Sequence, residues 1–252
     1  MLFSHPLVPA TLLRRYKRFL ADVRFDDGRE VTVHCPNPGA MTGLAAPGSR
    51  VWLAPATSAA AKLGWGWKLV EADGGIVGID ASLPNRLVAE ALEEGAIPAL
   101  RVFPRVRAEV RYGQENSRVD FLLGTDDGRA CYLEVKNVHL RRTGSLAEFP
   151  DCVTARGARH LRELASMVRA GARAILLFVV QRSDCERLAV AADIDPAYAA
   201  AFDDAIAAGV EVLAWDCALS QAEIRLRCPL PLARREGALQ AGTLIPEPPM
   251  AK

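Results

Sequence analysis

A predicted β-hairpin between Ser117 and His139 constrains the fold of this chain more than any other segment. Two stretches rich in β-branched and apolar residues flank the turn sequence Asp126-Asp127-Gly128. A three-residue loop with its glycine in the left-handed conformation is a favoured hairpin connection. With this loop, Asp120 is expected directly opposite Glu134 on the neighbouring strand.

The two faces of the hairpin differ in chemistry. One face is apolar throughout and carries Val119, Phe121, Leu123, Cys131, Leu133 and Val135. Side chains alternate between faces along a strand, so Lys136 shares the polar face with Asp120 and Glu134. Two carboxylates about 5 Å apart at Cβ destabilise a sheet unless a cation lies between them. The polar face therefore predicts a site for a divalent metal.

The same polar face has a second interpretation. Arg118 would lie opposite Lys136, so the charges could instead form a solvated set of diagonal salt bridges. The pattern Asp-(x13)-Glu-x-Lys favours the metal site. Many metal-dependent nucleases place an aspartate and a Glu-x-Lys motif on adjacent strands, between helices and before a buried strand.

Overall charge limits how the chain can bind nucleic acid. Its net charge is only +1, so any such affinity must come from local basic patches. Half of the residues are hydrophobic and 24% are charged, which is typical of a folded globular protein. The chain has neither an apolar leader segment nor a run of 18 apolar residues. We therefore expect a cytoplasmic protein that does not enter a membrane.

Cysteine spacing argues against a zinc site. The six cysteines are widely scattered, and none forms a C-x-x-C pair. In a chain of this length they are expected to be buried thiols in a reducing compartment. Burial is predicted in particular for Cys131 and Cys152.

Residues 1–82 are expected to form a small barrel. Five short strands are predicted between Phe19 and Asp80, with turns at Asp26-Asp27-Gly28 and Asp73-Gly74-Gly75. The five-stranded OB-fold matches this number and size of strands.

A basic segment with an aromatic residue begins this region. It comprises Arg14, Arg15, Tyr16, Lys17 and Arg18. Cations beside a stacking ring suit a nucleic-acid backbone, so these residues are predicted to bind nucleic acid. The alternative is a solvated edge strand that its cations protect from pairing with another chain.

Residues 83–242 show a different order: helix, three strands, helix, strand, helix and strand. The first helix is predicted over Asn85–Gly95, with Asn85 as its N-cap. Glu90 interrupts its apolar side and is a candidate third metal ligand; the alternative is a partly exposed helix acid. Further segments are a strand over Arg101–Tyr112 and a buried strand over Arg173–Gln181. Residues 243–252 are rich in proline and are expected to form a flexible tail.

The second predicted helix, Val153–Ala170, is strongly basic. Arg156, Arg159 and His160 lie outside its apolar stripe, and Arg156 and His160 are neighbours because they are four residues apart. These three residues are predicted to contact nucleic acid.

Several long segments resemble the sugar fermentation stimulation protein A family. They cover nearly the whole chain and follow one order: RRYKRFLADV (14–23), HCPNPGAM (34–41), PGSRVWL (47–53), YGQENSRVDFLL (112–123), EVKNVHL (134–140) and FPDCVTARGARHLREL (149–164). The resemblance implies a mixed α/β protein, with an OB-like barrel followed by a PD-(D/E)XK nuclease-like domain. It also implies nonspecific DNA binding and a link to the regulation of maltose and other sugar-utilisation genes.

Two functions follow from these observations. In the first, Asp120 and Glu134 bind Mg²⁺ (or Mn²⁺), Lys136 orients water or holds the phosphate, and the protein hydrolyses phosphodiesters. In the second, the protein is a noncatalytic DNA-binding regulator that retains the nuclease fold. A sugar-binding or metabolic enzyme has no supporting site in the sequence. The sequence predicts no oligomeric state.

Overall fold

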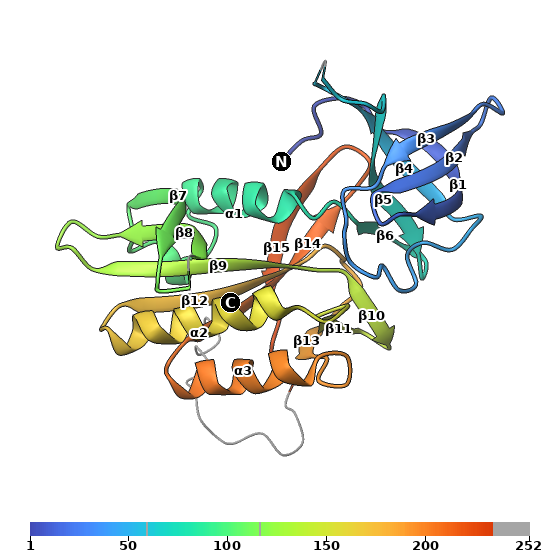
Figure 1. Ribbon diagram of the computed structural model, residues 1–252. Coiled ribbons are helices and arrows are strands. Elements are labelled where there is room, and N and C mark those ends of the chain that lie inside the picture. Colours follow the sequence, from blue (N-terminus) through green and yellow to red (C-terminus); the bar gives the residue numbers. More distant parts are fainter. Residues whose placement is uncertain (59, 116, 234–252) are drawn as a thin grey trace, which may run out of the picture.

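The chain folds into a β-barrel followed by a larger α/β unit, and Figure 1 shows the two side by side. The computed structural model describes residues 1–58, 60–115 and 117–233. The predicted tail, residues 243–252, lies outside the described residues. In the described part, no helix combines the length and apolar character needed to cross a membrane.

The N-terminal barrel has the OB topology that the sequence predicted, but one of its five strands, β1 (Val8–Tyr16), lies before the segment in which the five strands were expected. Its neighbouring strands follow the order β3-β2-β1-β4-β5, and a parallel contact between His34 of β3 and Gly66 of β5 closes it. Leu12, Val33 and Trp67 are fully buried inside it. The strands are β1 (Val8–Tyr16), β2 (Leu20–Phe25), β3 (Glu30–His34), β4 (Arg50–Pro55), β5 (Trp65–Ala72) and β6 (Gly75–Gly78), which pairs with β5.

A six-stranded mixed sheet forms the centre of the second, nuclease-like part. Its strand order is β15-β14-β12-β9-β8-β7, in which β9, β12 and β14 are parallel and β7, β8 and β9 form an antiparallel meander. The strands are β7 (Arg105–Tyr112), β8 (Ser117–Gly124), β9 (Ala130–Val138), β12 (Arg173–Val180), β14 (Glu211–Leu219) and β15 (Ile224–Pro229).

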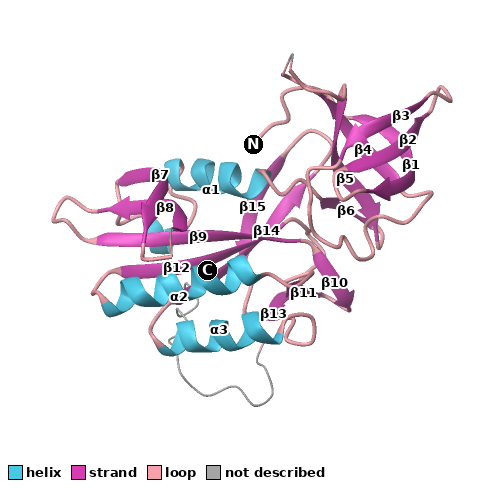
Figure 2. Ribbon diagram, in the orientation of Figure 1, coloured by secondary structure: helices cyan, strands magenta, loops and turns pink. Residues whose placement is uncertain are grey.

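Helices cover both faces of this sheet, as Figure 2 shows. Alternate residues of β12 point to opposite faces, so Ile175 packs on the α1 side and Phe178 on the α2 and α3 side. This double burial explains the continuous apolar run predicted for the strand. The helices are α1 (Leu83–Glu93), α2 (Ala155–Arg169) and α3 (Pro196–Ala207), with a 3₁₀ turn η1 (Pro98–Leu100).

A third, separate sheet has three short strands in the order β10-β11-β13. Its strands, which the sequence analysis did not predict, are β10 (Leu140–Thr143), β11 (Leu146–Phe149) and β13 (Arg187–Val190). The edge strand β15 was also missed. Four-residue strands offer too few alternating positions for a periodic signal, and β11 and β13 pair across some forty residues of chain.

Three predicted element starts are wrong by two or more residues, and α2 is one of them, because it begins at Ala155 and not at Val153. Helix α1 begins at Leu83 with Ser82 as its N-cap, not Asn85, because Pro84 is tolerated in a first turn where its missing N–H costs nothing. Strand β7 begins at Arg105 rather than Arg101, since residues 98–100 form the 3₁₀ turn and Pro104 follows it.

Buried polar contacts fix the junction between the barrel and the sheet. The Gln181 side-chain amide donates to the Asp80 carbonyl oxygen (3.0 Å), and Gly78 N–H donates to the Gln181 carbonyl oxygen (2.9 Å). A Cβ at Gly78 would overlap the Gln181 side chain, so the close approach needs glycine. Asp80 lies two residues before Ser82, the N-cap of α1, so these contacts tie the start of that helix to the central sheet.

Candidate metal centre

The hairpin of β8 and β9 has the register that its turn predicted. Phe121 pairs with Leu133 and Leu123 with Cys131, which places Asp120 opposite Glu134. The turn glycine, Gly128, has the left-handed φ of 85° that this loop requires. All six residues predicted for the apolar face are buried, but Val119 packs in the core on the α2 and α3 side, whereas the other five pack on the α1 side.

Asp120, Glu134 and Lys136 line a single cavity of about 420 Å³. The strands supply these three side chains, the start of α1 supplies one wall, and α2 supplies another. The remaining lining residues are Ala81, Ser82, Asn85, Val135, Arg156 and His160.

Two donors hold the Asp120 carboxylate in place. The Asn85 side-chain amide donates to Oδ1 (2.7 Å), and the backbone N–H of Val135 donates to Oδ2 (2.7 Å). Burial raises the pKa of Asp120 above its ordinary value, and the nearby charge of Glu134 raises it further. The carboxylate is therefore oriented by hydrogen bonds but carries poorly compensated charge.

Glu134 is buried with only one of its oxygens paired. Oε1 accepts from Lys136 Nζ (2.6 Å) and contacts His160 Nδ1. Oε2 is buried without a hydrogen-bond donor in the described part of the chain. Burial acts to raise the pKa of Glu134, but the charge of Lys136 and the hydrogen bond with His160 outweigh it and hold the pKa below its ordinary value.

His160 lies beneath the acidic pair, on α2. Its side chain is only 4% exposed, and its Nε2 accepts from Arg156 Nε (3.3 Å). With Nε2 accepting, Nδ1 carries the proton and donates to Glu134, an assignment that follows from the contacts. His160 thus contacts protein atoms at both ring nitrogens and orients Glu134.

These residues fit a hard divalent cation that keeps several waters. The described residues hold no group of three or more His, Cys, Asp or Glu side chains that could bind a metal. Mg²⁺, however, is usually held by one or two carboxylates and retains waters. The unpaired Oε2 of Glu134 and the buried carboxylate of Asp120, whose pKa is raised, are the groups that such a cation would contact.

Glu90, the predicted third ligand, does not line this cavity. Its carboxylate pairs with the N-terminal amino group of Met1 (2.7 Å), and its side chain is 38% exposed. The α1 residue that reaches the cavity is Asn85, which was expected only as a helix cap. The sequence did not predict this role for Asn85, because the helix was expected to begin after Pro84 and not before it.

The predicted basic segment of β1 is largely engaged within the barrel. Arg14 pairs with Asp22 (2.7 Å) and lies over the Tyr16 ring, whose hydroxyl also donates to Asp22. Arg15 donates to backbone carbonyls of the loop 37–40. These three side chains therefore stabilise the barrel and its adjoining loop.

The other predicted basic residues differ in exposure. Lys17 and Arg18 form the exposed turn between β1 and β2, and both have positive φ. Arg156 is exposed at the rim of the acidic cavity, and Arg159 is half-buried on α2. The structure brings Arg156 to the acidic pair, while Lys17 and Arg18 belong to the barrel.

The burial predicted for the cysteines holds for Cys131 but is wrong for Cys152. Cys131 is fully buried, whereas Cys152 is exposed in the segment that precedes α2. Helix α2 begins only at Ala155, after its N-cap Thr154, so Cys152 lies on a connecting segment and not on a packed helix face.

Two family models match consecutive parts of the chain. The SfsA N-terminal OB domain matches residues 13–79, and the sugar fermentation stimulation protein RE domain matches residues 82–223. The chain belongs to the sugar fermentation stimulation protein family. Homologues of that name from Jannaschia sp. (strain CCS1) and Rhodospirillum centenum are 57% and 56% identical to it. These alignments cover 92% and 87% of this chain, and 97% and 94% of the relatives.

A solved structure of the family has the same overall fold. Pyrococcus furiosus SfsA in complex with Ca²⁺ superposes with a TM-score of 0.83 at 30% identity. The match covers 93% of this chain and 98% of that protein. This agreement extends over both the barrel and the nuclease-like part.

Proposed function

We propose that this protein binds DNA without sequence preference and hydrolyses phosphodiester bonds with a Mg²⁺ ion held by Asp120 and Glu134. One observation carries the proposal: two carboxylates and Lys136 converge on one cavity, with Oε2 of Glu134 buried and unpaired. The Ca²⁺ in the Pyrococcus furiosus relative adds support for divalent-ion binding in the family.

Each group in the cavity has a role in this chemistry. When bound, Mg²⁺ or Mn²⁺ supplies a water of lowered pKa and neutralises charge that develops on the phosphate. Lys136 Nζ lies 2.6 Å from Glu134 Oε1, which positions it to orient the attacking water or to hold the scissile phosphate. Asn85 and His160 act as positioning residues, because they hold Asp120 and Glu134.

Phosphate binding is assigned to exposed cations near the cavity and on the barrel. Arg156 lines the cavity and is exposed, so it contacts a phosphate beside the acidic pair. Lys17 and Arg18 supply a second contact from the barrel turn. We further propose that the barrel unit (residues 1–82) and the nuclease-like unit (residues 83–242) bind the same DNA molecule.

A cleavage assay tests the proposal. Labelled DNA is incubated with the protein and Mg²⁺ or Mn²⁺, alongside Asp120→Ala, Glu134→Gln and Lys136→Ala. Each variant is expected to lose about a hundredfold or more in cleavage rate. Asp26→Ala, which removes an exposed carboxylate of the barrel, is the control and retains wild-type cleavage.

The assay also separates the two candidate functions. If wild-type protein binds DNA but cleaves none with either metal, the protein is a noncatalytic DNA-binding regulator and the phosphodiesterase proposal fails. Cleavage that persists in Asp120→Ala and Glu134→Gln would overturn the assignment of the site.

A further inference from the structure

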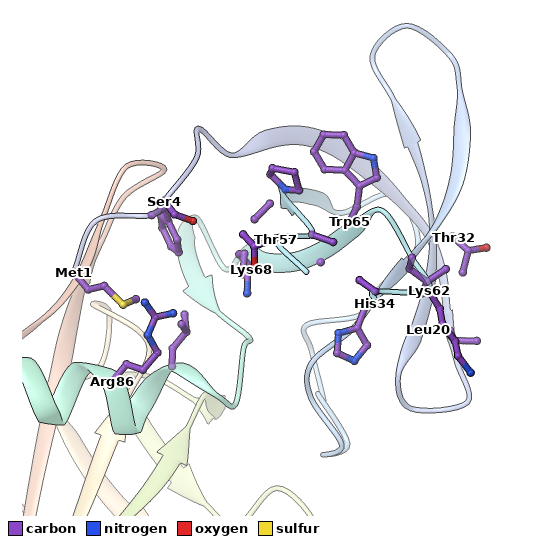
Figure 3. Close-up of a pocket in the computed structure, with 18 of the residues that line it drawn as sticks. Met1, Ser4, Leu20, Thr32, His34, Thr57, Lys62, Trp65, Lys68 and Arg86 are labelled. Carbon is purple, nitrogen blue, oxygen red and sulfur yellow. The ribbon is translucent and has the colours of Figure 1, made fainter. Parts of the chain in front are cut away.

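A second, larger cavity lies between the barrel and the start of α1. It is a cleft of about 800 Å³. Figure 3 shows Arg86 and Met1 on one side of it and Thr32, His34 and Lys62 on the other. Strands, a loop and a helix from both parts of the molecule therefore form its walls.

The barrel wall of the cleft is the face with which OB-folds bind oligonucleotides. Leu20 of β2 and both Thr32 and His34 of β3 line it, and Leu20 pairs directly with His34. The connection between β4 and β5 contributes Thr57 and residues 61–63. In OB-folds, the face of strands 2 and 3 and the loop between strands 4 and 5 form the ligand site.

Planar rings are available at this wall. His34 is exposed and stacks with Phe19, with ring centroids 6.4 Å apart and planes at 21°. Phe19 is itself 47% exposed, which is unusual for a large apolar side chain. Trp65 also lines the cleft, and its edge-to-face contact with Phe25 holds the ring in place. Such rings suit the stacking of unpaired bases.

The charge of the cleft is positive. Lys62 and Lys68 line its barrel side, and Arg86 projects from α1. Among the described residues, no aspartate or glutamate lines it. Lys68 is paired with Asp80, so Lys62 and Arg86, both exposed, are the cations left to contact a phosphate backbone.

One short segment separates the cleft from the acidic cavity. Leu83 and Arg86 line the cleft, whereas Ser82 and Asn85 line the cavity of Asp120. The two sites are therefore on neighbouring sides of the first turn of α1. A chain that leaves the cleft around this turn arrives at the acidic pair.

We infer that the cleft holds a single, unpaired nucleic-acid strand, with bases stacked on His34 and Trp65 and backbone on Lys62 and Arg86. A volume of about 800 Å³ suits a few unstacked bases, since pockets of about 300–1,000 Å³ hold small ligands. A duplex keeps its base faces stacked inside and offers none to these rings. The strand's path to Asp120 rests on the proposed function; its binding in the cleft does not.

Fluorescence anisotropy tests this inference. The probes are a labelled oligothymidine of about 16 nucleotides, the upper site size of one OB-fold, and a duplex of equal length. All proteins carry Asp120→Asn, which prevents cleavage during the measurement. The single strand is expected to bind at least about tenfold more tightly than the duplex. His34→Ala and Trp65→Ala each weaken single-strand binding about tenfold, since stacking of one base contributes that much.

Further variants control for loss of folding and test the contribution of the cations to binding. His34 and Lys62 are exposed, so their alanine variants carry the test even if Trp65→Ala perturbs the barrel. Lys62→Ala and Arg86→Ala each lower the slope of log affinity against log salt by about one. Arg107→Ala, on the exposed edge strand β7, is the charge-matched control and leaves single-strand affinity unchanged.

The outcomes distinguish this inference from the proposed function. Equal affinity for the two probes, or single-strand affinity that His34→Ala and Lys62→Ala leave unchanged, overturns the cleft assignment even if wild-type protein cleaves DNA. If the single-strand preference is strong and depends on His34, but wild-type protein does not cleave DNA in the cleavage assay, the cleft assignment is supported and the phosphodiesterase proposal is overturned.

Discussion

The acidic cavity and the junction around Asp80 both contain buried carboxylates, but the two regions pair them differently. Asp80 has a side chain only 1% exposed, and both of its oxygens are satisfied. Oδ1 accepts from the backbone and hydroxyl of Ser82 (2.9 and 2.6 Å), and Oδ2 pairs with Lys68. Glu134 is as deeply buried, yet its Oε2 has no donor in the described chain.

A third acid at the junction, Asp151, is half-buried. Its Oδ2 contacts His139 Nε2 and accepts from the backbone N–H of Met41, both at 3.3 Å. A Cβ at Gly39 would overlap its carboxylate, so the loop 37–41 is built around this side chain. The comparison teaches that the junction acids stabilise the fold, whereas the cavity holds an Asp120 carboxylate whose pKa is raised, so its charge costs stability that ligand binding would relieve.

The largest expected effect is on Asp80. Asp80→Asn leaves Lys68 without its partner and weakens the acceptor for Ser82, so the free energy of unfolding falls by about 2–3 kcal/mol. Lys68 is 24% exposed and can partly rehydrate, which keeps the loss below that of a fully buried pair. Urea denaturation measures the change.

The exposed pair of Asp26 and Arg50 provides the control for that measurement. Asp26→Asn is expected to cost less than about 1 kcal/mol, because the Asp26 side chain is 61% exposed. An equal loss in the two variants would contradict the structural role assigned to Asp80.

Asp151→Asn is expected to cost about 1–2 kcal/mol at pH 7. Burial acts to raise the pKa of Asp151, but the contact with His139 Nε2 and the hydrogen bond from the backbone N–H of Met41 outweigh it and lower the pKa to about 2. Because the folded-state pKa is depressed, this stabilisation is present above pH 4 and is lost as pH falls towards 2. Denaturation of wild type and variant should therefore differ at pH 7 and converge near pH 2.

Asp120→Asn is expected to have the opposite sign and the smallest size, a gain of about 0.5–1 kcal/mol at pH 7 in the absence of metal. Burial and Glu134 raise the pKa of Asp120, so the folded state binds its proton more tightly than the unfolded state does. Wild-type stability accordingly falls as pH rises from the ordinary aspartate pKa through the raised one.

A pH series of unfolding measurements, made with a chelator present, checks that sign. The gain in Asp120→Asn should grow across this window and then stay constant at higher pH. If Asp120→Asn is less stable than wild type at pH 7, Asp120 stabilises the fold as Asp80 does, and the prediction is wrong.

Local turn chemistry made the acidic pair predictable from sequence. Gly128 closes the hairpin loop, and that loop alone sets which residues of β8 and β9 face each other. The start of α3 was predictable for the same reason, because Asp195 caps it and Pro196 follows in its first turn.

The rest of the site depends on packing between distant segments. Asn85 reaches Asp120 because α1 starts two residues earlier than expected. Glu90 lies five residues further along, so its side chain is rotated about 140° around the helix axis from that of Asn85 and points away from the cavity. His160 meets Glu134 only because α2 packs on β9, a contact that no spacing within either segment encodes. The cleft of His34 and Arg86 likewise needs the barrel and α1 to be assembled.

Calorimetric titration of metal-free protein with Mg²⁺, and separately with Ca²⁺, tests the central claim most directly. We expect one ion to bind per chain, with binding abolished in Asp120→Asn and in Glu134→Gln and retained in Glu90→Gln. Undiminished binding in the two cavity variants, or no binding by the wild-type protein, would contradict a metal centre between the hairpin strands.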